Sequence, residues 1–215
     1  MKKILFKDKD IVVPGEIIAS GMDVLPAGCA FRENENIVAS QVGLINISEN
    51  IVKVIPLTGV YLPKKGDTII GTIEDMTSNV WFVDIGGPYN GILAIRDVPE
   101  FVDKGDELGK YYDYGEVIAA KVNKMVKNKS IELTMKQPGL TKLKEGILIT
   151  ITSSKVPRVI GKQGSMVDLI KKMTNTKITI GQNGIVWIKG NSAQDEALAI
   201  KAIKKVEAES HLEGL

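Results

Sequence analysis

The chain has few of the side chains on which disulfide-bonded proteins and most metal sites depend. Its 215 residues include one cysteine, Cys29, and one histidine, His211. A lone cysteine provides neither a disulfide framework nor a cysteine-based zinc site, which favours a reducing compartment. No apolar run is long enough to cross a bilayer, and the opening Met1 to Phe6 is too short for an export signal. We therefore expect a cytoplasmic protein.

Residues suited to catalysis are equally scarce. The sequence shows no pairing of Ser or Cys with His and no cluster of metal ligands. One stretch of acids could be interpreted as a magnesium site for phosphodiester chemistry: Asp97, Glu100, Asp103, Asp106 and Glu107. Their irregular spacing around Pro99 and Gly105 favours a solvated loop instead. We expect a protein that is not an enzyme and that holds no metal and no cofactor.

The charge of the chain is unevenly distributed. Positions 141–215 hold 12 Lys and Arg against 7 Asp and Glu, a net +5, whereas positions 1–140 hold 16 against 19, a net −3. A basic C-terminal segment suits a polyanionic ligand such as a nucleic acid. The length, the 44% hydrophobic content and the density of turn residues indicate two or three small domains.

Two glycines three residues apart, Gly161 and Gly164, mark the most informative segment. A strand-like run from Ile147 to Thr152 precedes them, and a helix-patterned run from Met166 to Thr174 follows. Because the two glycines lack Cβ atoms, a sugar-phosphate backbone can lie directly against the loop, and the amide N–H groups of the following helix face the phosphates. The segment resembles the GxxG loop of a KH domain, whose ligand is single-stranded RNA or DNA.

The residues after the loop have the element order of such a domain. Two β-branched runs, Lys177 to Gly181 and Ile185 to Lys189, flank the pair Asn183-Gly184, which is a strong hairpin signal. Ser192 then caps a last helix with apolar residues at helical spacing. The order strand, helix, GxxG, helix, strand, strand, helix predicts a type I KH domain over 141–215.

Basic residues gather around this loop. Between Ile147 and Lys177, six lysines and arginines face one acid, Asp168. Such a cluster would neutralise phosphates and make binding depend on salt. The residues expected to contact the strand are Gly161, Lys162, Gln163, Gly164, Lys155, Arg158, Ile160, Lys171 and Lys172. Of the two helix lysines, Lys171 and Lys172, at least one is expected to be no more than a solvated side chain.

The middle of the chain, over 63–138, is predicted to be a barrel of short strands. Five β-rich segments are separated by Gly, Pro, Asn and Asp: Asp67 to Ile73, Val80 to Ile85, Gly91 to Ile95, Glu116 to Val126 and Ser130 to Lys136. Five is the number of strands in an OB fold. The stretches Gly66 to Ile73, Trp81 to Gly87 and Asn90 to Leu93 resemble the OB domain named after ribosomal protein S-one. That family binds single-stranded RNA by stacking bases on barrel aromatics within a basic groove.

Aromatic residues on this barrel are candidate base contacts. Phe82 falls at the family's phenylalanine position, and Trp81 and Tyr89 lie nearby. Adjacent strand residues point to opposite faces, so at most one of Trp81 and Phe82 faces a ligand. Ile92 and Ala94 occupy positions where the family often has Phe and His, so fewer rings are available for base stacking. The lysines of the last hairpin could follow RNA phosphates or only keep the hairpin soluble: Lys121, Lys124, Lys127 and Lys129.

The first 62 residues are predicted to form a small β domain. Four segments alternate like strands between glycine-rich turns: Val12 to Ile18, Ile37 to Ala39, Val42 to Ile47 and Ile51 to Ile55. The polar stretch from Glu33 to Asn36 is expected at a turn. Few aromatics and little basic charge suit this domain to docking on a protein rather than on a nucleic acid. The alternative is that it only covers and stabilises the barrel.

The order of the three domains, 1–62, 63–138 and 141–215, resembles that of one family over essentially the whole chain. Val12 to Gly15, Gln137 to Leu140 and Arg158 to Met166 match the RNA-binding cap subunit of the archaeal exosome, ribosomal-RNA-processing protein four. The resemblance implies that three copies sit on a hexameric ring of exonuclease-like subunits, with the N-terminal domain gripping the ring and the OB domains around the entry pore. It further implies that the protein recruits single-stranded, poly(A)-rich RNA and guides its 3′ end into the pore, but cuts nothing.

Two other classes of protein share these modules. A bacterial family of transcription elongation or antitermination factors also joins an S-one-type barrel to KH modules, but its KH domains are tandem and of the other topology. Polynucleotide phosphorylase carries both modules behind large catalytic cores, for which 215 residues leave no room. A transcription elongation or antitermination factor remains the alternative function.

Overall fold

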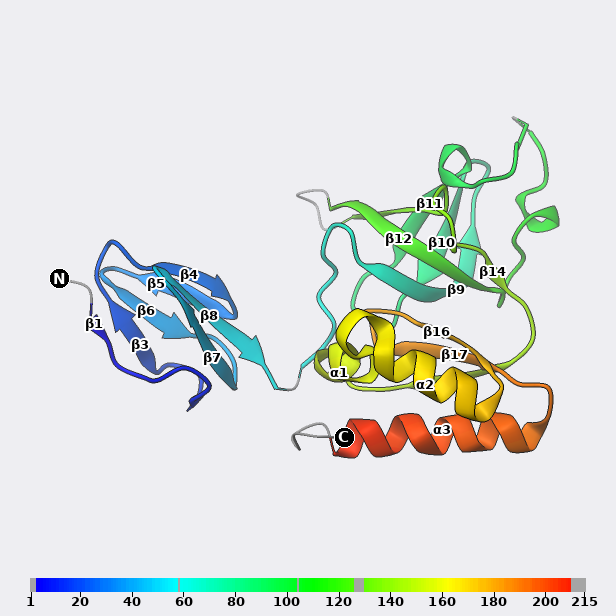
Figure 1. The fold of residues 1–215 in the computed structure, drawn as a ribbon. Helices are drawn as coiled ribbons and strands as arrows, with labels where there is room; N and C mark the ends of the chain where they lie inside the picture. Colours follow the sequence, from blue (N-terminus) through cyan, green and yellow to red (C-terminus); the bar gives the residue numbers. More distant parts are fainter. Residues whose placement is uncertain (1–2, 58, 104, 126–129, 210–215) are drawn as a thin grey trace. The chain divides into compact units, whose positions relative to one another are not determined.

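The computed structural model of the chain describes residues 3–57, 59–103, 105–125 and 130–209 (Figure 1). It falls into two compact units, Met1–Gly59 and Val60–Leu215. Three residues considered above, Lys127, Lys129 and His211, lie outside the described residues. In the part of the chain that is described, no helix is long and apolar enough to span a membrane.

The first unit consists of two four-stranded sheets that share one core. One sheet has the strand order β1 (Lys3–Ile4), β3 (Ile17–Ser20), β6 (Asn36–Ala39) and β5 (Ala30–Glu33). The other has the order β2 (Ile11–Val12), β7 (Gly43–Ser48), β8 (Ile51–Pro56) and β4 (Leu25–Gly28). Side chains alternate between the two faces of each strand, so every second residue is free to point inward. Ile18 and Ile37 from the first sheet therefore pack in one cluster with Ile45 and Val52 from the second.

This unit contains more strands than the sequence predicts. The run from Val12 to Ile18, expected as one strand, belongs to two strands in different sheets, because Gly15 turns the chain between them with a φ of +88°. β4 was missed because Pro26 and Gly28 lower its β propensity. The predicted polar turn is present, with Asn34 at a φ of +54° between β5 and β6.

The second unit begins with the predicted five-stranded, OB-like barrel. Its strands are β9 (Thr68–Met76), β10 (Val80–Asp84), β11 (Gly91–Ala94), β12 (Val117–Met125) and β13 (Ile131–Thr134). They follow the order β13-β11-β10-β9-β12, and pairing of β12 with β13 closes the barrel. A short strand, β14 (Lys142–Leu143), pairs with the start of β12. Two 3-10 turns, η1 (Ile95–Asp97) and η2 (Leu108–Lys110), lie in the long connection between β11 and β12.

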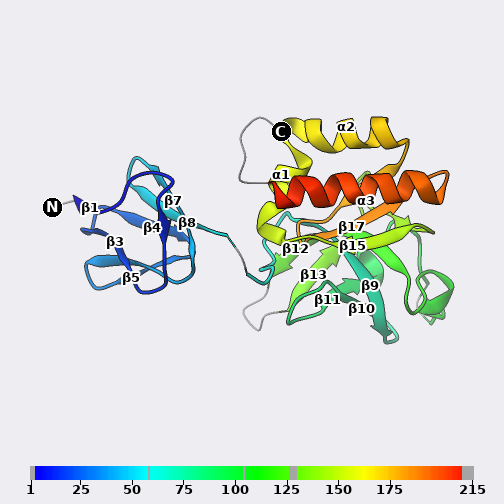
Figure 2. The ribbon, with the colours of Figure 1, turned by 90° about the horizontal axis from the view of Figure 1, so that it is seen from below.

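The C-terminal part has the predicted type I KH fold. Its elements are β15 (Ile147–Thr150), η3 (Ser153–Lys155), α1 (Val156–Ile160), η4 (Lys162–Gly164), α2 (Ser165–Thr174), β16 (Lys177–Ile180), β17 (Ile185–Lys189) and α3 (Ala193–Ala208). The antiparallel sheet has the order β15-β17-β16. Ser192 caps α3 as expected, since its side chain accepts a hydrogen bond from the Asp195 N–H at 3.2 Å. Figures 1 and 2 show β16 and β17 between the barrel and the helices.

The barrel and the KH domain have separate cores but lie in one compact unit. The turn between β16 and β17 is inserted into the barrel, where the Gln182 N–H donates to the Thr68 carbonyl at 2.7 Å. The next residue, Asn183, is buried and bonds to two barrel residues, Ile70 and Ile85. The boundaries of a three-domain division, at 62/63 and 138/141, stay a prediction.

Candidate nucleic-acid interface

The GxxG loop has a backbone that only glycine accepts at its first position. Gly161 has a φ of 77° and a ψ of 174°, and a Cβ atom there would lie 2.7 Å from the backbone nitrogen of Met166. Gly164, at the other end, is left-handed with a φ of 84°. Gln163 also has a positive φ, 53°, which turns the chain sharply out of α1 and into α2. The result is a tight loop whose tip carries two exposed side chains, Lys162 and Gln163.

The start of α2 suits the loop to phosphate binding. No side chain caps its N-terminus, because the N-cap residue is Gly164. The first N–H groups of a helix have no partner within the helix, and the helix dipole favours an anion beside them. Lys162 adds a positive charge next to these donors. The loop therefore combines two glycines, N–H donors and a cation.

Three of the other predicted contacts belong to the segment leading into the loop. Lys155 is half-buried and its ammonium donates to the Glu207 carbonyl at 3.1 Å, which ties this segment to the end of α3. Arg158 and Ile160 are half-buried on α1. Lys155 thus anchors the segment that precedes the loop. Arg158 and Ile160 lie closer to the glycines along the chain.

The two lysines of α2 differ from each other. Lys171 pairs with Asp168 at 3.6 Å, one turn earlier on the same helix, whereas Lys172 is exposed. Such exposed pairs contribute little to stability. Lys172 is therefore the better candidate for an electrostatic contact.

The prediction that Trp81 contacts RNA is wrong. Its side chain is 0% exposed in the barrel core, where its indole N–H donates to the Tyr112 carbonyl at 3.0 Å. The ring of Tyr112 meets it edge-on, with centroids 5.3 Å apart. The alternation of β10 turns Trp81 inward and leaves its neighbour Phe82 on the outer face.

Phe82 lies on an outer barrel face that is apolar but small. It is opposite Ile92 on β11, and Val80 is opposite Ala94. A groove of about 650 Å³ adjoins this face; its lining residues include Val80, Ile92, Ala94, Arg96, Asp97 and Glu132. Tyr89 is exposed in the turn between β10 and β11. The face can stack a base on Phe82, but the residues opposite it are aliphatic.

Charges around this groove have mixed signs. Arg96 pairs with Asp97 at 3.3 Å, and Lys124 lies opposite Glu132 in the β12–β13 register. Lys121 donates to the Gln137 side chain at 2.8 Å. The barrel face is therefore less suited to phosphates than the KH loop.

The acid-rich loop after β11 uses two of its carboxylates to accept hydrogen bonds from tyrosine hydroxyls. Glu100 accepts from the Tyr112 hydroxyl at 2.7 Å and Asp106 from the Tyr111 hydroxyl at 2.8 Å. Burial, the Glu100 hydrogen bond and its charge together raise the pKa of Tyr112. Among the described residues no group of three or more His, Cys, Asp or Glu side chains is arranged to hold a metal ion.

Comparison with known proteins agrees with this architecture. The N-terminal domain model of the exosome RNA-binding protein RRP4 matches residues 9–58, and a KH domain model matches residues 146–194. The exosome complex component Rrp4 of Thermococcus kodakarensis is 45% identical over 219 aligned positions, which cover 100% of this chain and 85% of the relative. The chain belongs to the Rrp4 family.

Other members of the Rrp4 family agree over similar lengths. The Rrp4 of Pyrococcus furiosus is 43% identical, with 100% of this chain and 83% of the relative covered. The Rrp4 of Methanothermus fervidus is 40% identical, with 99% of this chain and 94% of the relative covered. A crystal structure of an exosome complex RNA-binding protein is 33% identical, covers 73% of this chain and 91% of that chain, and has a TM-score of 0.65.

The N-terminal unit, the part matched by the Rrp4 N-terminal model, presents an exposed apolar face that the sequence did not reveal. Ile11, Leu44 and Ile55 lie opposite one another across β2, β7 and β8. Val13, Val42 and Leu57 continue the same outward alternation beyond the strand ends, and Leu57 N–H donates to the Val42 carbonyl at 3.2 Å. We call these six residues the apolar face: Ile11, Val13, Val42, Leu44, Ile55 and Leu57. Five of them are exposed and Leu44 is half-buried.

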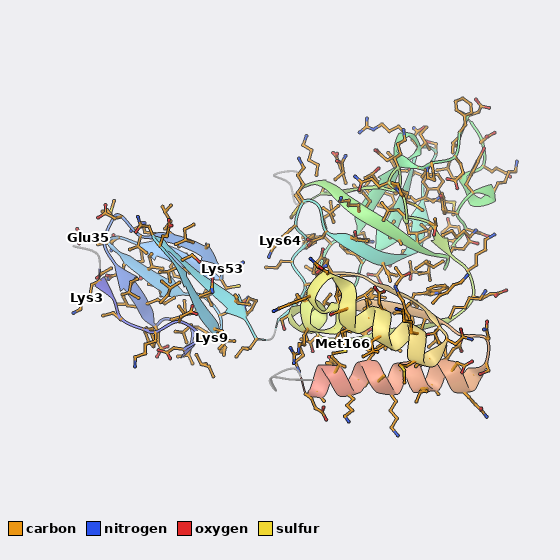
Figure 3. The ribbon with its side chains drawn as sticks, viewed as in Figure 1. Lys3, Lys9, Glu35, Lys53, Lys64 and Met166 are labelled. Atoms are coloured by element: carbon orange, nitrogen blue, oxygen red, sulfur yellow. The ribbon has the colours of Figure 1, made fainter. Side chains whose placement is uncertain are left out.

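The next cross-strand pair on the outward face of this sheet is polar. Asn46 lies opposite Lys53, which is labelled in Figure 3, so the apolar face ends there. Alternation along each strand could have predicted which residues share a face. The antiparallel register that aligns them across three strands could not be read from sequence.

Proposed function

We propose that this chain is a non-catalytic, RNA-binding cap subunit of an exosome. Three copies sit on a hexameric ring of exonuclease-like subunits, recruit single-stranded RNA with a preference for poly(A)-rich sequence, and guide its 3′ end into the pore for degradation in the 3′-to-5′ direction. Its Rrp4 relatives are named as components of the exosome complex, which supports the assembly.

The part of the proposal that concerns RNA binding rests on one observation, the geometry of the GxxG loop. Gly161 allows the loop to pack tightly on the start of α2, and the loop then presents the uncapped end of α2 and the cation of Lys162 to a strand. This arrangement recognises a sugar-phosphate backbone rather than a particular base. Phe82 on the barrel is the second contact, and it would add base stacking without strong selectivity.

The part of the proposal that concerns docking on the ring rests on the apolar face of the N-terminal unit. Exposed apolar patches of this kind mark protein interfaces because leaving them in water costs free energy. The face contains no charged residue, whereas a surface that binds nucleic acid needs cations. We assign it to contact with the ring.

The proposal that the chain is non-catalytic rests on the types of residue it contains. The chain has one cysteine and one histidine, and its acid-rich loop is engaged with tyrosine hydroxyls. Hydrolysis or phosphorolysis of a phosphodiester needs a nucleophile, a base or a metal cluster positioned at the reacting phosphate. We expect no shortening of labelled RNA by the purified chain with magnesium, manganese or phosphate, and reproducible phosphate-dependent shortening would contradict this.

The test of the RNA-binding half is a double substitution at the loop tip. In Lys162→Asp with Gln163→Asp, two negative charges stand where phosphates pass, and RNA affinity should fall by about 2 kcal/mol, roughly a 30-fold rise in Kd. Both positions are exposed, so the melting temperature should not change. A control with the same substitution types at two other exposed positions, Lys7→Asp with Gln194→Asp, should bind RNA nearly as wild type does.

The readout is fluorescence anisotropy of a labelled single-stranded oligonucleotide, with A-rich, U-rich and double-stranded competitors. Equal affinity of the loop variant and the control would show that the loop is not the main contact. Loss of affinity with rising salt is also expected. If the full chain binds RNA but fails to associate with a ring of exonuclease-like subunits, the alternative of a transcription elongation or antitermination factor is favoured.

A further inference from the structure

The two long helices of the KH domain, α2 and α3, lie side by side on the face away from the barrel. They pack against each other, and the chain colours in Figure 1 show that they run in opposite directions. Strand β17 faces the barrel strand β9 on the other side of the sheet. The outer surface of the helix pair is thus uncovered by the second unit itself.

One flank of α2 carries apolar side chains at the edge of the core and outside it, since Met166 packs partly against the core whereas Leu169 and Met173 are exposed. The core side of this helix is formed by Val167, Ile170 and Thr174. Met166, Leu169 and Met173 follow the spacing i, i+3, i+7, which places them on one flank. Met166, labelled in Figure 3, is half-buried near the start of α2. Leu169 is 55% exposed and Met173 is 74% exposed.

The facing flank of α3 is also apolar. Lys204 and Glu207 bond to Thr150 and Thr152, so their flank of α3 faces the β15 side. The opposite flank, toward α2, carries Leu198 and Ala202. Leu198 is 53% exposed. Together these side chains form an apolar surface along the junction of two antiparallel helices, which we call the α2–α3 groove: Met166, Leu169, Met173, Leu198 and Ala202.

The rim of the α2–α3 groove is basic. Lys172 on α2 and Lys201 and Lys205 on α3 are exposed, and the described part of the chain offers no ion pair to any of them. Two acids of these helices are already engaged, since Asp168 pairs with Lys171 and Asp195 accepts a hydrogen bond from the Ser192 hydroxyl. An apolar floor between lysines complements a ligand that is apolar on one side and acidic on the other.

We propose that the α2–α3 groove docks an acidic amphipathic helix of a partner protein. A third helix laid along two antiparallel helices would place its i, i+3, i+4 and i+7 residues against the two leucines and the methionines. Methionine side chains adapt to different partner shapes, which suits such a floor. Carboxylates on the flanks of the third helix would meet Lys172, Lys201 and Lys205.

RNA is the less favoured occupant of this groove. Its floor contains no aromatic ring on which a base could stack, and thioether and aliphatic groups do not pair with base edges. The GxxG loop precedes α2, but Lys162 and Gln163 lie at the loop tip and not on the groove flank. The groove therefore gives the KH domain a protein-binding surface separate from the GxxG loop, although Lys172 on its rim is also a candidate RNA contact.

The test uses the full-length chain and a synthetic helical peptide. The probe carries Leu at i, i+3, i+4 and i+7 and Glu on the remaining faces, with a fluorescent label. Two matched peptides accompany it, one with the same composition in scrambled order and one with Lys in place of Glu. We expect saturable binding of the acidic helix, and at least tenfold weaker binding of both matched peptides.

Substitutions then locate the site. Leu169→Ser with Met173→Ser should weaken peptide binding at least tenfold, and Leu198→Ser should weaken it severalfold. The matched control is Met22→Ser with Leu25→Ser, which removes an equally exposed methionine and leucine from the N-terminal unit and should have no effect. The loop variant Lys162→Asp with Gln163→Asp should keep peptide binding, so failure of the RNA-binding proposal is distinguishable from failure of this one.

Three results would overturn the proposal. The first is no saturable binding of the acidic peptide, or equal binding of the scrambled peptide. The second is equal loss of binding in the groove variant and in the Met22 and Leu25 control. The third is a groove variant that keeps peptide binding but loses affinity for a single-stranded oligonucleotide, which would assign the groove to RNA.

Discussion

The side chain of Asn183 pairs with the backbone of Ile70 through both halves of its amide. Its Nδ2 donates to the Ile70 carbonyl at 2.7 Å and its Oδ1 accepts from the Ile70 N–H at 3.3 Å. Nδ2 also donates to the Ile85 carbonyl at 2.9 Å. An amide presents the same donor and acceptor as a peptide group, so the KH turn completes hydrogen bonds that strand β9 would otherwise lack there. This buried side chain joins the barrel and the KH domain together with the hydrogen bond from the Gln182 N–H to the Thr68 carbonyl.

Replacing Asn183 with Ala should destabilise the second unit. Three buried backbone groups would lose their partner, which we expect to cost about 2 to 4 kcal/mol. Thermal and urea unfolding of the full chain measure the change. Asn191→Ala, at an exposed position two residues after β17, is the control and should leave stability within about 0.5 kcal/mol of wild type.

Asn183→Asp separates the two roles that this residue could have. Asp-Gly supports a tight turn about as well as Asn-Gly does, but a carboxylate cannot donate to the Ile70 and Ile85 carbonyls. If the hydrogen bonds matter, the Asp variant is at least as unstable as the Ala variant. Recovery of wild-type stability by Asp would mean that only the turn conformation matters.

Gly161→Ala should damage the GxxG loop locally. A φ of 77° with a ψ of 174° belongs to a region populated essentially by glycine, and the new Cβ would lie 2.7 Å from the Met166 nitrogen. We expect RNA affinity to fall at least tenfold and stability to fall by about 1 to 3 kcal/mol. Gly139→Ala is the control, because its φ is +86° but no atom lies within 4 Å of the added Cβ. A Gly161 variant that binds RNA as tightly as the Gly139 variant would contradict the assigned role of the loop.

Phe82 and Trp81 should respond in opposite ways to truncation. Phe82→Ala removes a partly exposed ring, so RNA affinity should fall severalfold, by about 1 kcal/mol or more, with a small change in melting temperature. Trp81→Ala opens a cavity in the barrel core and should cost about 3 to 5 kcal/mol of stability. The pair is compared by calorimetry and by anisotropy with a labelled oligonucleotide. Unchanged RNA affinity in the Phe82 variant would restrict the barrel to a supporting role.

The stability of the KH domain should depend on pH through Glu207. Burial by itself would raise the pKa of this carboxyl, but hydrogen bonds from the Thr152 N–H at 2.7 Å, the Thr152 hydroxyl at 2.9 Å and the Lys204 ammonium at 3.2 Å outweigh it and lower the pKa below its usual 4.5. A depressed pKa means that the folded state favours the charged form. The stabilisation is therefore complete above pH 4.5 and is lost as the pH falls through the lowered pKa.

Glu207→Gln removes this dependence. At neutral pH the variant should be less stable than wild type by about 1 to 2 kcal/mol, and the gap should close in acid. Urea unfolding at a series of pH values measures it, with Glu35→Gln at an exposed turn as the control. A gap of constant size from pH 7 to pH 3 would show that the charge of Glu207 is not its source.

The elements that sequence predicted well are those specified by neighbours in the chain. The GxxG loop, the Asn-Gly hairpin and the cap at Ser192 each depend on residues within a few positions, and all three are present. Period-two alternation also predicted that only one of Trp81 and Phe82 could face outward. It could not say which, because alternation is symmetrical and only closure of the barrel decides which face becomes the core.

The features that sequence missed depend on distant residues. Asn183 was recognised as a turn residue, but its partner Ile70 lies 113 positions earlier, and nothing local indicates that the turn is buried. Gly15 was placed inside a single strand, whereas it directs the two halves into different sheets. The apolar face of the N-terminal unit depends in the same way on the register of β2, β7 and β8.

The last prediction concerns separable roles at the two ends of the chain. Point substitutions test it better than truncation, because removing the KH domain would leave the Ile70 N–H and two barrel carbonyls without the Asn183 amide. Ile11→Asp with Ile55→Asp places two charges in one cross-strand row of the apolar face, next to Leu44. Burying unpaired charges in an interface costs several kcal/mol, so association with the exonuclease ring should be lost. Both positions are exposed, and folding should be retained.

The measurement is co-elution of the full chain with reconstituted ring, scored beside oligonucleotide affinity. The docking variant should fail to co-elute yet bind RNA as wild type does, whereas the Lys162 and Gln163 variant should co-elute and bind RNA weakly. Either variant should slow decay of an A-rich RNA by the assembled ring, because a strand held near the pore is delivered at high effective concentration. Met22→Asp with Phe31→Asp, at exposed positions of the same unit outside the apolar face, is the control and should co-elute. If the Ile11 and Ile55 variant still co-elutes, the ring contact lies elsewhere, and the apolar face must serve a different partner.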